Sequence, residues 1–217
     1  MSSRPLGRPP MFDRDDAVLA AARLFWSRGY SGTTTRALSS ALGMSTSSIY
    51  AAFGSKAGLF EEAVRTFAER YRTIYAEACA EPELGDVLER LLRRSVEEFT
   101  QPRARHPGCL ISSAAMTDMP DTIDTRTYVS DLHASNEQLL RERIERARDA
   151  GRLRPGVDPS TLAALVQTLW HGLSAQSNQG LDRDRLLEIV DAALGTLLDQ
   201  EGPGGRPATQ PERSRPA

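Results

Sequence analysis

Residues 33–56 constrain the fold more than any other part of this 217-residue chain, and they read TTTRALSSALGMSTSSIYAAFGSK. They predict two short helices joined by a tight turn at Gly43, because helices that cross closely need a small residue between them. Leu38, Leu42 and Ile49 supply apolar side chains for the inner side of both helices. Such a hairpin near the N-terminus, followed by a long helical remainder, is typical of a DNA-binding protein.

The expected outer face of the second hairpin helix begins with four small hydroxyl residues, namely Ser45, Thr46, Ser47 and Ser48. Hydroxyls bond phosphates or base edges, and a threonine methyl can touch the methyl group of thymine. Arg36 is placed for a guanine edge or a phosphate. Lys56, the only lysine in the chain, is placed for a phosphate at the positive N-terminal end of the next helix. Tyr50 either packs in the core or contacts the DNA backbone.

The net charge of −2 conceals an uneven distribution of charge along the chain. Residues 1–56 carry seven basic and three acidic residues, which gives this part a net charge of +4. Residues 57–200 carry 17 basic and 24 acidic residues, a net charge of −7. We expect the positive N-terminal part to meet a phosphate backbone, whereas the acidic remainder need not touch DNA.

Apolar residues follow helical spacing along nearly the whole chain, which predicts an all-α fold of about nine helices. Besides the two hairpin helices, we expect helices over residues 13–28, 55–80, 83–101, 108–119, 124–150, 159–179 and 182–200. Ser45 is expected to cap the second hairpin helix, and Ser55 the helix that follows it. The predicted organisation is a flexible basic arm at 1–12, a helix-turn-helix domain at 13–56, a second helical domain at 57–200 and a disordered tail at 201–217.

The sequence argues against several other classes of protein. No apolar run reaches the roughly 18–20 residues of a membrane span, and the N-terminus shows no secretory signal. Two cysteines, Cys79 and Cys109, are too few for a disulfide framework, which favours a cytoplasmic protein. A phosphate-binding glycine loop and a Gly-x-Ser-x-Gly elbow are missing, and the histidines do not lie at metal spacing. We therefore expect no enzyme activity, metal site or cofactor.

A longer pattern surrounds the hairpin, consisting of Ala21-Ala22-Arg23-Leu24-Phe25, Gly29-Tyr30, Thr34-Thr35-Arg36, Leu38, Leu42-Gly43, Ser45, Ser48-Ile49-Tyr50, Phe53-Gly54-Ser55-Lys56 and Leu59-Phe60. Through these residues, positions 13–60 resemble the N-terminal domain of TetR/AcrR-family transcriptional regulators. The rest of the chain fits that family in helix number and length only. The resemblance implies a three-helix DNA-binding domain followed by a helical domain that binds an effector and forms a dimer.

By position, the resemblance implies DNA contacts along the whole hairpin. Thr34 and Thr35 would start the helix that braces on the backbone, and Arg36 sits where some members read a base. Residues 45–51 would form the recognition helix, and Tyr50 and Lys56 commonly clamp phosphates.

The chain departs from the family pattern within the recognition helix. Thr46 stands where the family often has a basic residue or proline, and Ser47 stands where it often has glycine. Ala51 and Ala52 occupy positions at which the family frequently has a ring-bearing residue such as histidine. Because this face is small and uncharged, we expect DNA recognition to depend more on Arg36, on backbone contacts and on DNA shape. Arginines of the N-terminal arm would then enter the minor groove, namely Arg4 and Arg8.

The last two expected helices carry leucine-rich stripes that either pair with a second copy of the chain or close the core of the protomer. In the resembling family these helices form a four-helix dimer interface. The candidate interface residues are Leu162, Leu165, Val166, Leu169, Leu173, Leu186, Val190, Ala193, Leu194 and Leu197.

The resemblance also implies a pocket for a small, often apolar effector between the DNA-binding domain and the dimer interface. Aromatic, methionine and histidine side chains make adaptable pocket walls, although they also build ordinary cores. The candidate lining residues are Phe67, Tyr71, Phe99, Cys109, Met116, Met119, Tyr128, His133, Trp170 and His171.

These patterns predict a homodimeric regulator, a repressor, that binds a palindromic double-stranded operator and is released by a small apolar molecule. One alternative is a thiol sensor for electrophiles or oxidants at Cys109, because a helix N-terminus lowers the pKa of a thiol. A small buried cysteine would explain the same residue. A further alternative is an architectural DNA-binding protein without an effector.

Overall fold

The computed structural model describes residues 13–101, 109–111 and 125–198. Within these ranges the chain is all-α, as predicted, and forms eight helices. They are α1 (Arg14–Gly32), α2 (Thr35–Leu42), α3 (Thr46–Phe53), α4 (Lys56–Cys79), α5 (Leu84–Phe99), α7 (Thr125–Asp149), α8 (Pro159–Asn178) and α9 (Arg183–Leu198). Most of the predicted helix at 108–119, together with the predicted arm and tail, lies outside the described residues, although Leu110 and Ile111 are helical.

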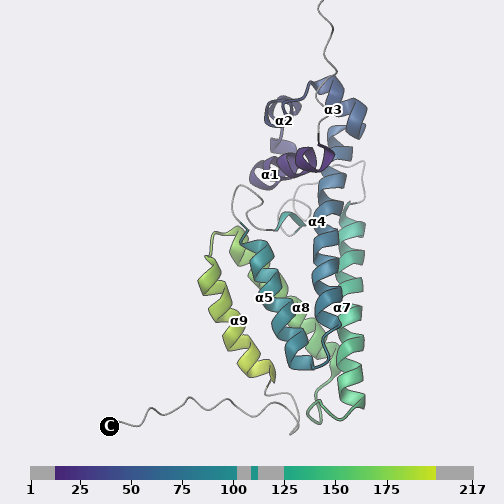
Figure 1. Ribbon diagram of the computed structural model, residues 1–217, viewed down its shortest axis with the longest axis vertical. Helices are drawn as coiled ribbons and strands as arrows, with labels where there is room; N and C mark the ends of the chain where they lie inside the picture. Colours follow the sequence, from purple (N-terminus) through teal and green to yellow (C-terminus); the bar gives the residue numbers. More distant parts are fainter. Residues whose placement is uncertain (1–12, 102–108, 112–124, 199–217) are drawn as a thin grey trace, which may run out of the picture.

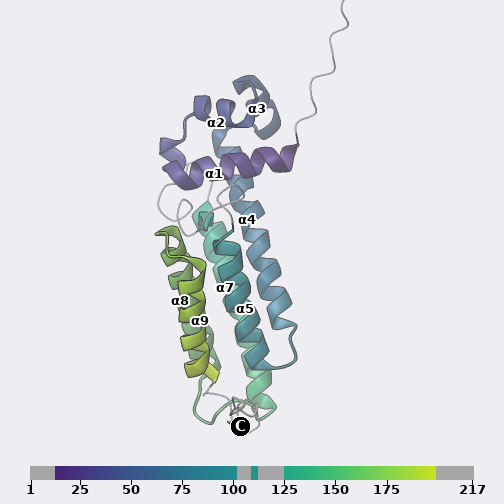
Figure 2. The ribbon, with the colours of Figure 1, turned by 60° about the vertical axis from the view of Figure 1, so that its left-hand side comes forward.

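The helices separate into a head and a bundle (Figure 1). Helices α1, α2 and α3 lie together at one end of the molecule, and α4 runs from this end down into the bundle of α5, α7, α8 and α9. The turned view shows the same division, with α1 lying across the top of the bundle (Figure 2). Since α4 belongs to both parts, its first turn fixes the head relative to the bundle.

Local side-chain chemistry sets the ends of the helices in the head. Thr34, Ser45 and Ser55 are the N-caps of α2, α3 and α4, and each side chain accepts a hydrogen bond from the backbone N–H three residues later. Gly43 ends α2 at φ 64°, a left-handed conformation that glycine adopts without strain. The cap positions predicted at Ser45 and Ser55 are therefore confirmed.

Gly29 interrupts the helix at the predicted end, and a further short helical segment follows it. It has φ 72° and ψ 173° and kinks the chain, but helical structure continues beyond it to Gly32. The extra turn brings Tyr30 against Phe25 and Phe60, with ring centroids 6.1 and 5.2 Å away. The kink thus lets α1 close the core of the head.

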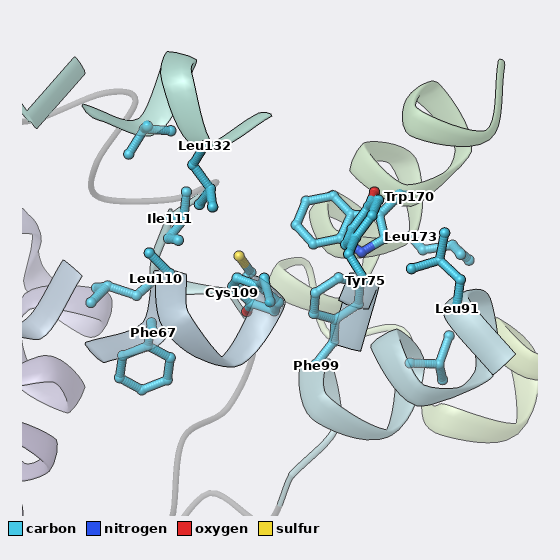
Figure 3. Close-up of a cluster of buried hydrophobic side chains, with 14 of the residues drawn as sticks. Phe67, Tyr75, Leu91, Phe99, Cys109, Leu110, Ile111, Leu132, Trp170 and Leu173 are labelled. Carbon is cyan, nitrogen blue, oxygen red and sulfur yellow. The ribbon is translucent and has the colours of Figure 1, made fainter. Parts of the chain in front are cut away.

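The buried apolar side chains form one continuous cluster that runs from the head through the bundle. Figure 3 shows part of it, with Cys109, Leu110 and Ile111 among side chains from α4, α5, α7 and α8. Among the helices that the structure describes, none is long and apolar enough to cross a membrane.

Candidate nucleic-acid interface and sensor core

The start of α3 presents a cluster of hydroxyl groups to solvent. Ser45, Thr46, Ser47 and Ser48 are all exposed. The Ser45 hydroxyl caps the helix and lies 2.9 Å from the Ser47 hydroxyl and 2.8 Å from that of Ser48. Free N–H groups at a helix N-terminus and short hydroxyls both suit a phosphate or a base edge.

Further residues extend this surface along α3 and to the start of α2. Tyr50 is 44% exposed, so its ring lies on the surface, and its hydroxyl is 3.4 Å from the Thr35 hydroxyl. Arg36 is exposed beside them. Thr34 is exposed too, with its hydroxyl engaged in capping α2. The contact between Thr35 and Tyr50 brings the start of α2 next to α3, and the other predicted residues of this region are exposed, while Arg4 and Arg8 lie outside the described residues.

Lys56 has a structural task that the sequence did not reveal. Its ammonium group donates hydrogen bonds to the carbonyl oxygens of Tyr30 at 2.8 Å and Thr33 at 2.9 Å. It also lies 4.1 Å from the centroid of the Tyr30 ring, a cation–π contact. Two of the three ammonium donors thus tie the end of α1 to α4, which leaves one for the predicted phosphate.

Two contacts fix the corner between α3 and α4. Arg14 pairs with Glu62 at 2.6 Å and also donates to the carbonyl oxygen of Ala52 at 3.0 Å. A Cβ atom added at Gly58 would lie 2.2 Å from the carbonyl oxygen of Phe53. Only glycine therefore lets α4 start this close to the end of α3.

Below the head, several of the predicted effector residues form a packed aromatic cluster. The Trp170 ring lies 5.2 Å from the rings of Tyr71 and Phe99, centroid to centroid. His133 and His171 approach each other at 4.4 Å, and both rings face Trp170. Helices α4, α5, α7 and α8 each contribute, so the cluster exists only in the folded bundle.

Buried hydrogen bonds run beside this cluster through residues that the sequence analysis missed. Tyr75 donates to Gln167 Oε1, and Gln167 Nε2 lies 3.3 Å from His171 Nε2. The Trp170 indole N–H donates to the Ser95 hydroxyl at 2.8 Å. The signal that could have found Gln167 is its place one helical turn before His171 on the apolar side of α8.

Two polar atoms of the cluster have no hydrogen-bond partner among the described residues, the Tyr71 hydroxyl and His133 Nε2. Burial raises the pKa of Tyr71 well above its usual value, and the nearby Cys109 raises it further. Burial, together with His171, lowers the pKa of His133 to about 4, so this ring is neutral near pH 7. An unsatisfied buried polar group costs about 1–3 kcal/mol, which makes both atoms candidates for contact with a ligand.

The remaining effector candidates lie in different surroundings. Phe67 and Cys109 are buried, and the Cys109 thiol is 0% exposed, which favours the predicted role as a small core residue. Tyr128 instead packs against two arginines of α4, with Arg65 4.4 Å and Arg72 5.6 Å from its ring centroid. Met116 and Met119 lie outside the described residues.

Most of the candidate dimer residues face the core of their own protomer. Seven are buried there, namely Leu162, Val166, Leu173, Leu186, Val190, Leu194 and Leu197. For these seven, closing the protomer core accounts for the leucine stripes. Leu165 is 53% exposed, and Leu169 and Ala193 are half-buried. Within the candidate set, only these three leave side-chain surface free to contact a second copy.

The described part of the chain has open grooves, and two of them are lined by residues outside the aromatic cluster. One, of about 220 Å³, lies between α4 and α5 and is lined largely by charged residues. The other, of about 370 Å³, lies between the start of α8 and the end of α9, with Leu165 on its wall. Within the described ranges, no group of three His, Cys, Asp or Glu side chains is arranged to hold a metal ion.

Comparison with known protein families gives one match for the head and one for the bundle. The family model described as bacterial regulatory proteins, tetR family, matches residues 18–63. The model described as tetracyclin repressor-like, C-terminal domain, matches residues 87–193.

Individual proteins match over most of the chain. The HTH-type transcriptional repressor ComR of Escherichia coli K12 is 27% identical over 190 residues, which cover 87% of this chain and 90% of ComR. AcnR, a repressor of Corynebacterium glutamicum, is 28% identical over 195 residues, or 90% of this chain and 97% of AcnR. A solved structure of the TetR family regulator CifR, a cysteine variant complexed with 26-bp double-strand operator DNA, is 36% identical with a TM-score of 0.75, covering 87% of this chain and 98% of that one.

Proposed function

The chain belongs to the TetR family of bacterial transcriptional regulators, and from this premise we propose that it is a homodimeric repressor released from its operator by a small effector. The proposal rests on the hydroxyl-rich surface at the start of α3, which is part of the α2–α3 hairpin. Helix α4 begins at the end of this hairpin and continues into the aromatic cluster. Reader and sensor are thus joined by one continuous helix.

Operator binding is supported by the relatives and by the surface itself. ComR and AcnR are described as repressors, and CifR was solved on operator DNA. Of the described residues on this surface, Arg36 alone is an exposed positively charged residue, so affinity depends on phosphate contacts and DNA shape more than on a dense set of base contacts. Binding should therefore weaken steeply with salt.

Footprinting of the DNA upstream of the gene, at low salt, tests this part of the proposal. We expect protection of a palindromic site, since two heads related by a two-fold axis read two half-sites. Protection of no palindrome would contradict it. An asymmetric or sequence-independent footprint that no small molecule changes would favour the architectural alternative.

The effector is proposed to be a small neutral molecule with a largely apolar body. Among the described residues, the Tyr71 hydroxyl and His133 Nε2 have no hydrogen-bond partner of ordinary geometry inside a cluster of aromatic rings, and both groups are uncharged near pH 7. A ligand that accepts a hydrogen bond from the Tyr71 hydroxyl would satisfy a buried group that has no such partner in the described part of the chain.

A thermal-shift screen of small neutral apolar compounds tests the effector, since a ligand that binds the folded state raises the melting temperature. A true effector should also lower operator affinity. Tyr71→Phe should weaken the response to compounds that accept a hydrogen bond, and leave operator affinity unchanged. Stabilisation that Tyr71→Phe does not affect would place the ligand elsewhere.

The second copy of the chain is proposed to pack on the outer face of α8 and α9. Leu165 is exposed there on the wall of an apolar groove, and in a two-fold contact a leucine of one copy can enter the groove of the other. Leu165→Arg should yield a folded monomer by light scattering. A variant that stays dimeric would move the interface to another surface.

A further inference from the structure

The side-chain amide of Asn178, the last residue of α8, connects the head to the bundle. Its Oδ1 accepts a hydrogen bond from the Trp26 indole N–H of α1 at 3.2 Å. The same oxygen accepts from the backbone N–H of Cys109 at 2.8 Å, and Nδ2 donates to the Cys109 carbonyl oxygen at 3.2 Å. Residues separated by 152 and 69 positions in sequence therefore meet at one amide group.

This arrangement fixes the orientation of the Asn178 amide. Oδ1 faces two N–H donors, and Nδ2 faces a carbonyl acceptor. Rotating the amide by 180° would place the NH₂ group against both donors and the oxygen against the carbonyl, so all three hydrogen bonds would be lost together. A displacement of Cys109 or of Trp26 therefore disturbs the hydrogen bond that Asn178 makes to the other residue.

The two ends of this connection lie in functionally different places. Cys109 lies close to Tyr71, whose ring belongs to the aromatic cluster, and Figure 3 shows Cys109 in that core. Trp26 follows Phe25 in α1, and the Phe25 ring packs on Phe60 of α4 with centroids 5.0 Å apart. The amide thus spans from the sensor core to the helix that backs the α2–α3 hairpin.

We propose that Asn178 is a positioning residue that couples the Cys109 segment to the orientation of α1, in parallel with the covalent route along α4. The inference rests on the proposed function, because it needs a head that binds DNA. When DNA holds the head in one orientation, Trp26 is held on Asn178, and Asn178 in turn holds the Cys109 backbone. By linkage, whatever loosens the Cys109 segment weakens the hold on DNA by the same factor.

Hydrogen exchange of the amides at residues 109–111 tests the coupling, measured with and without a duplex carrying the footprinted operator. Two variants break the connection at different points. Trp26→Phe removes the indole donor and leaves the Asn178–Cys109 pair, whereas Asn178→Leu removes all three hydrogen bonds at similar volume. The matched control is Ser177→Ala, which removes the neighbouring bond to the Phe99 carbonyl oxygen inside the bundle.

In the wild-type protein, DNA should slow exchange at 109–111 by at least about fivefold, the lower end of common coupling factors. Both variants should still bind DNA yet show less than about half of this slowing on a logarithmic scale, while Ser177→Ala behaves as wild type. Amides of α9 serve as the reference for global stabilisation. If Asn178→Leu fails to fold, Trp26→Phe decides alone.

The outcomes separate the two proposals. A wild-type protein that binds no operator overturns the proposed function and this inference with it. A wild-type protein that binds operator without slowing exchange at 109–111 overturns the inference alone. Full slowing in Trp26→Phe does so too, because the signal then travels without Asn178.

Discussion

The head and the bundle solve opposite physical problems. In the head, polar groups lie on the surface, and the helix ends are satisfied by side chains only three residues away. In the bundle, polar groups lie inside an aromatic core, and two of them have no partner among the described residues. A rigid head can present a constant face to DNA, whereas a core with unsatisfied groups can gain energy from a ligand.

The largest effect is expected at the corner that joins these two parts. Gly58→Ala places a methyl group 2.2 Å from the Phe53 carbonyl oxygen, so α3 and α4 must move apart. We expect a loss of about 3 kcal/mol in the free energy of unfolding, measured by urea denaturation, and weaker operator binding. Gly32→Ala is the control, because its Cβ would meet only Arg28 at an ordinary 3.5 Å. Equal stability of the two variants would contradict the role of Gly58.

Substitutions of Lys56 and Arg36 distinguish a residue that stabilises the head from a residue that contacts DNA. Lys56→Met loses two hydrogen bonds from a charged donor to backbone carbonyls, so we expect a loss of stability of about 2 kcal/mol. Arg36→Ala should leave the melting temperature unchanged and reduce operator binding by about 1–3 kcal/mol. A Lys56→Met protein with wild-type stability but weak binding would assign this lysine to DNA alone.

Inside the bundle, the Ser95 hydroxyl supports the aromatic cluster. Ser95→Ala leaves the buried Trp170 indole N–H without its acceptor, which should cost about 1–2 kcal/mol of stability. Operator affinity measured well below the melting temperature should stay as in the wild type, because the head is untouched. Ser95→Cys, which keeps a weak acceptor, should recover part of the loss; no difference between the two variants would count against the hydrogen bond.

The smallest effect at neutral pH is expected from His133. Its pKa is about 4 when folded and about 6.5 in an unfolded chain, so between these values the unfolded state binds more protons. Stability should therefore fall as the pH drops from 6.5 towards 4, and this loss is absent above 6.5. His171 lies against His133, and burial lowers the pKa of His171 as well, so its titration adds to the loss of stability.

The measurement is the difference in melting temperature between wild type and His133→Gln at pH 7.5 and at pH 5. The carboxylates titrate alike in both proteins and cancel in this difference. The wild type should lose more stability than the variant on acidification. Parallel curves would show that the folded protein accepts a proton at His133 without cost.

Prediction from sequence succeeded best where a structure depends on neighbouring residues. The all-α class follows from the helical spacing of apolar residues, and the end of α2 follows from Gly43. The caps at Ser45 and Ser55 follow from side chains that bond a backbone N–H only three residues away. Three aromatic effector candidates, Tyr71, Phe99 and Trp170, meet in one cluster, and their role in effector binding stays a prediction. Tyr128 shows the limit, because its ring packs on arginines that periodicity does not place.

The sequence by itself determined the helices, their caps and the exposed hydroxyl surface, because those depend on local hydrogen bonds and on helical period. Only the tertiary structure decided which side of α8 faces out, since leucines occur on both sides and Leu165 alone among its large apolar residues is exposed. It also decided the partners of Lys56, Gln167 and Asn178. Their hydrogen bonds reach across 23 to 152 positions, and no pattern along the chain specifies a partner at that distance.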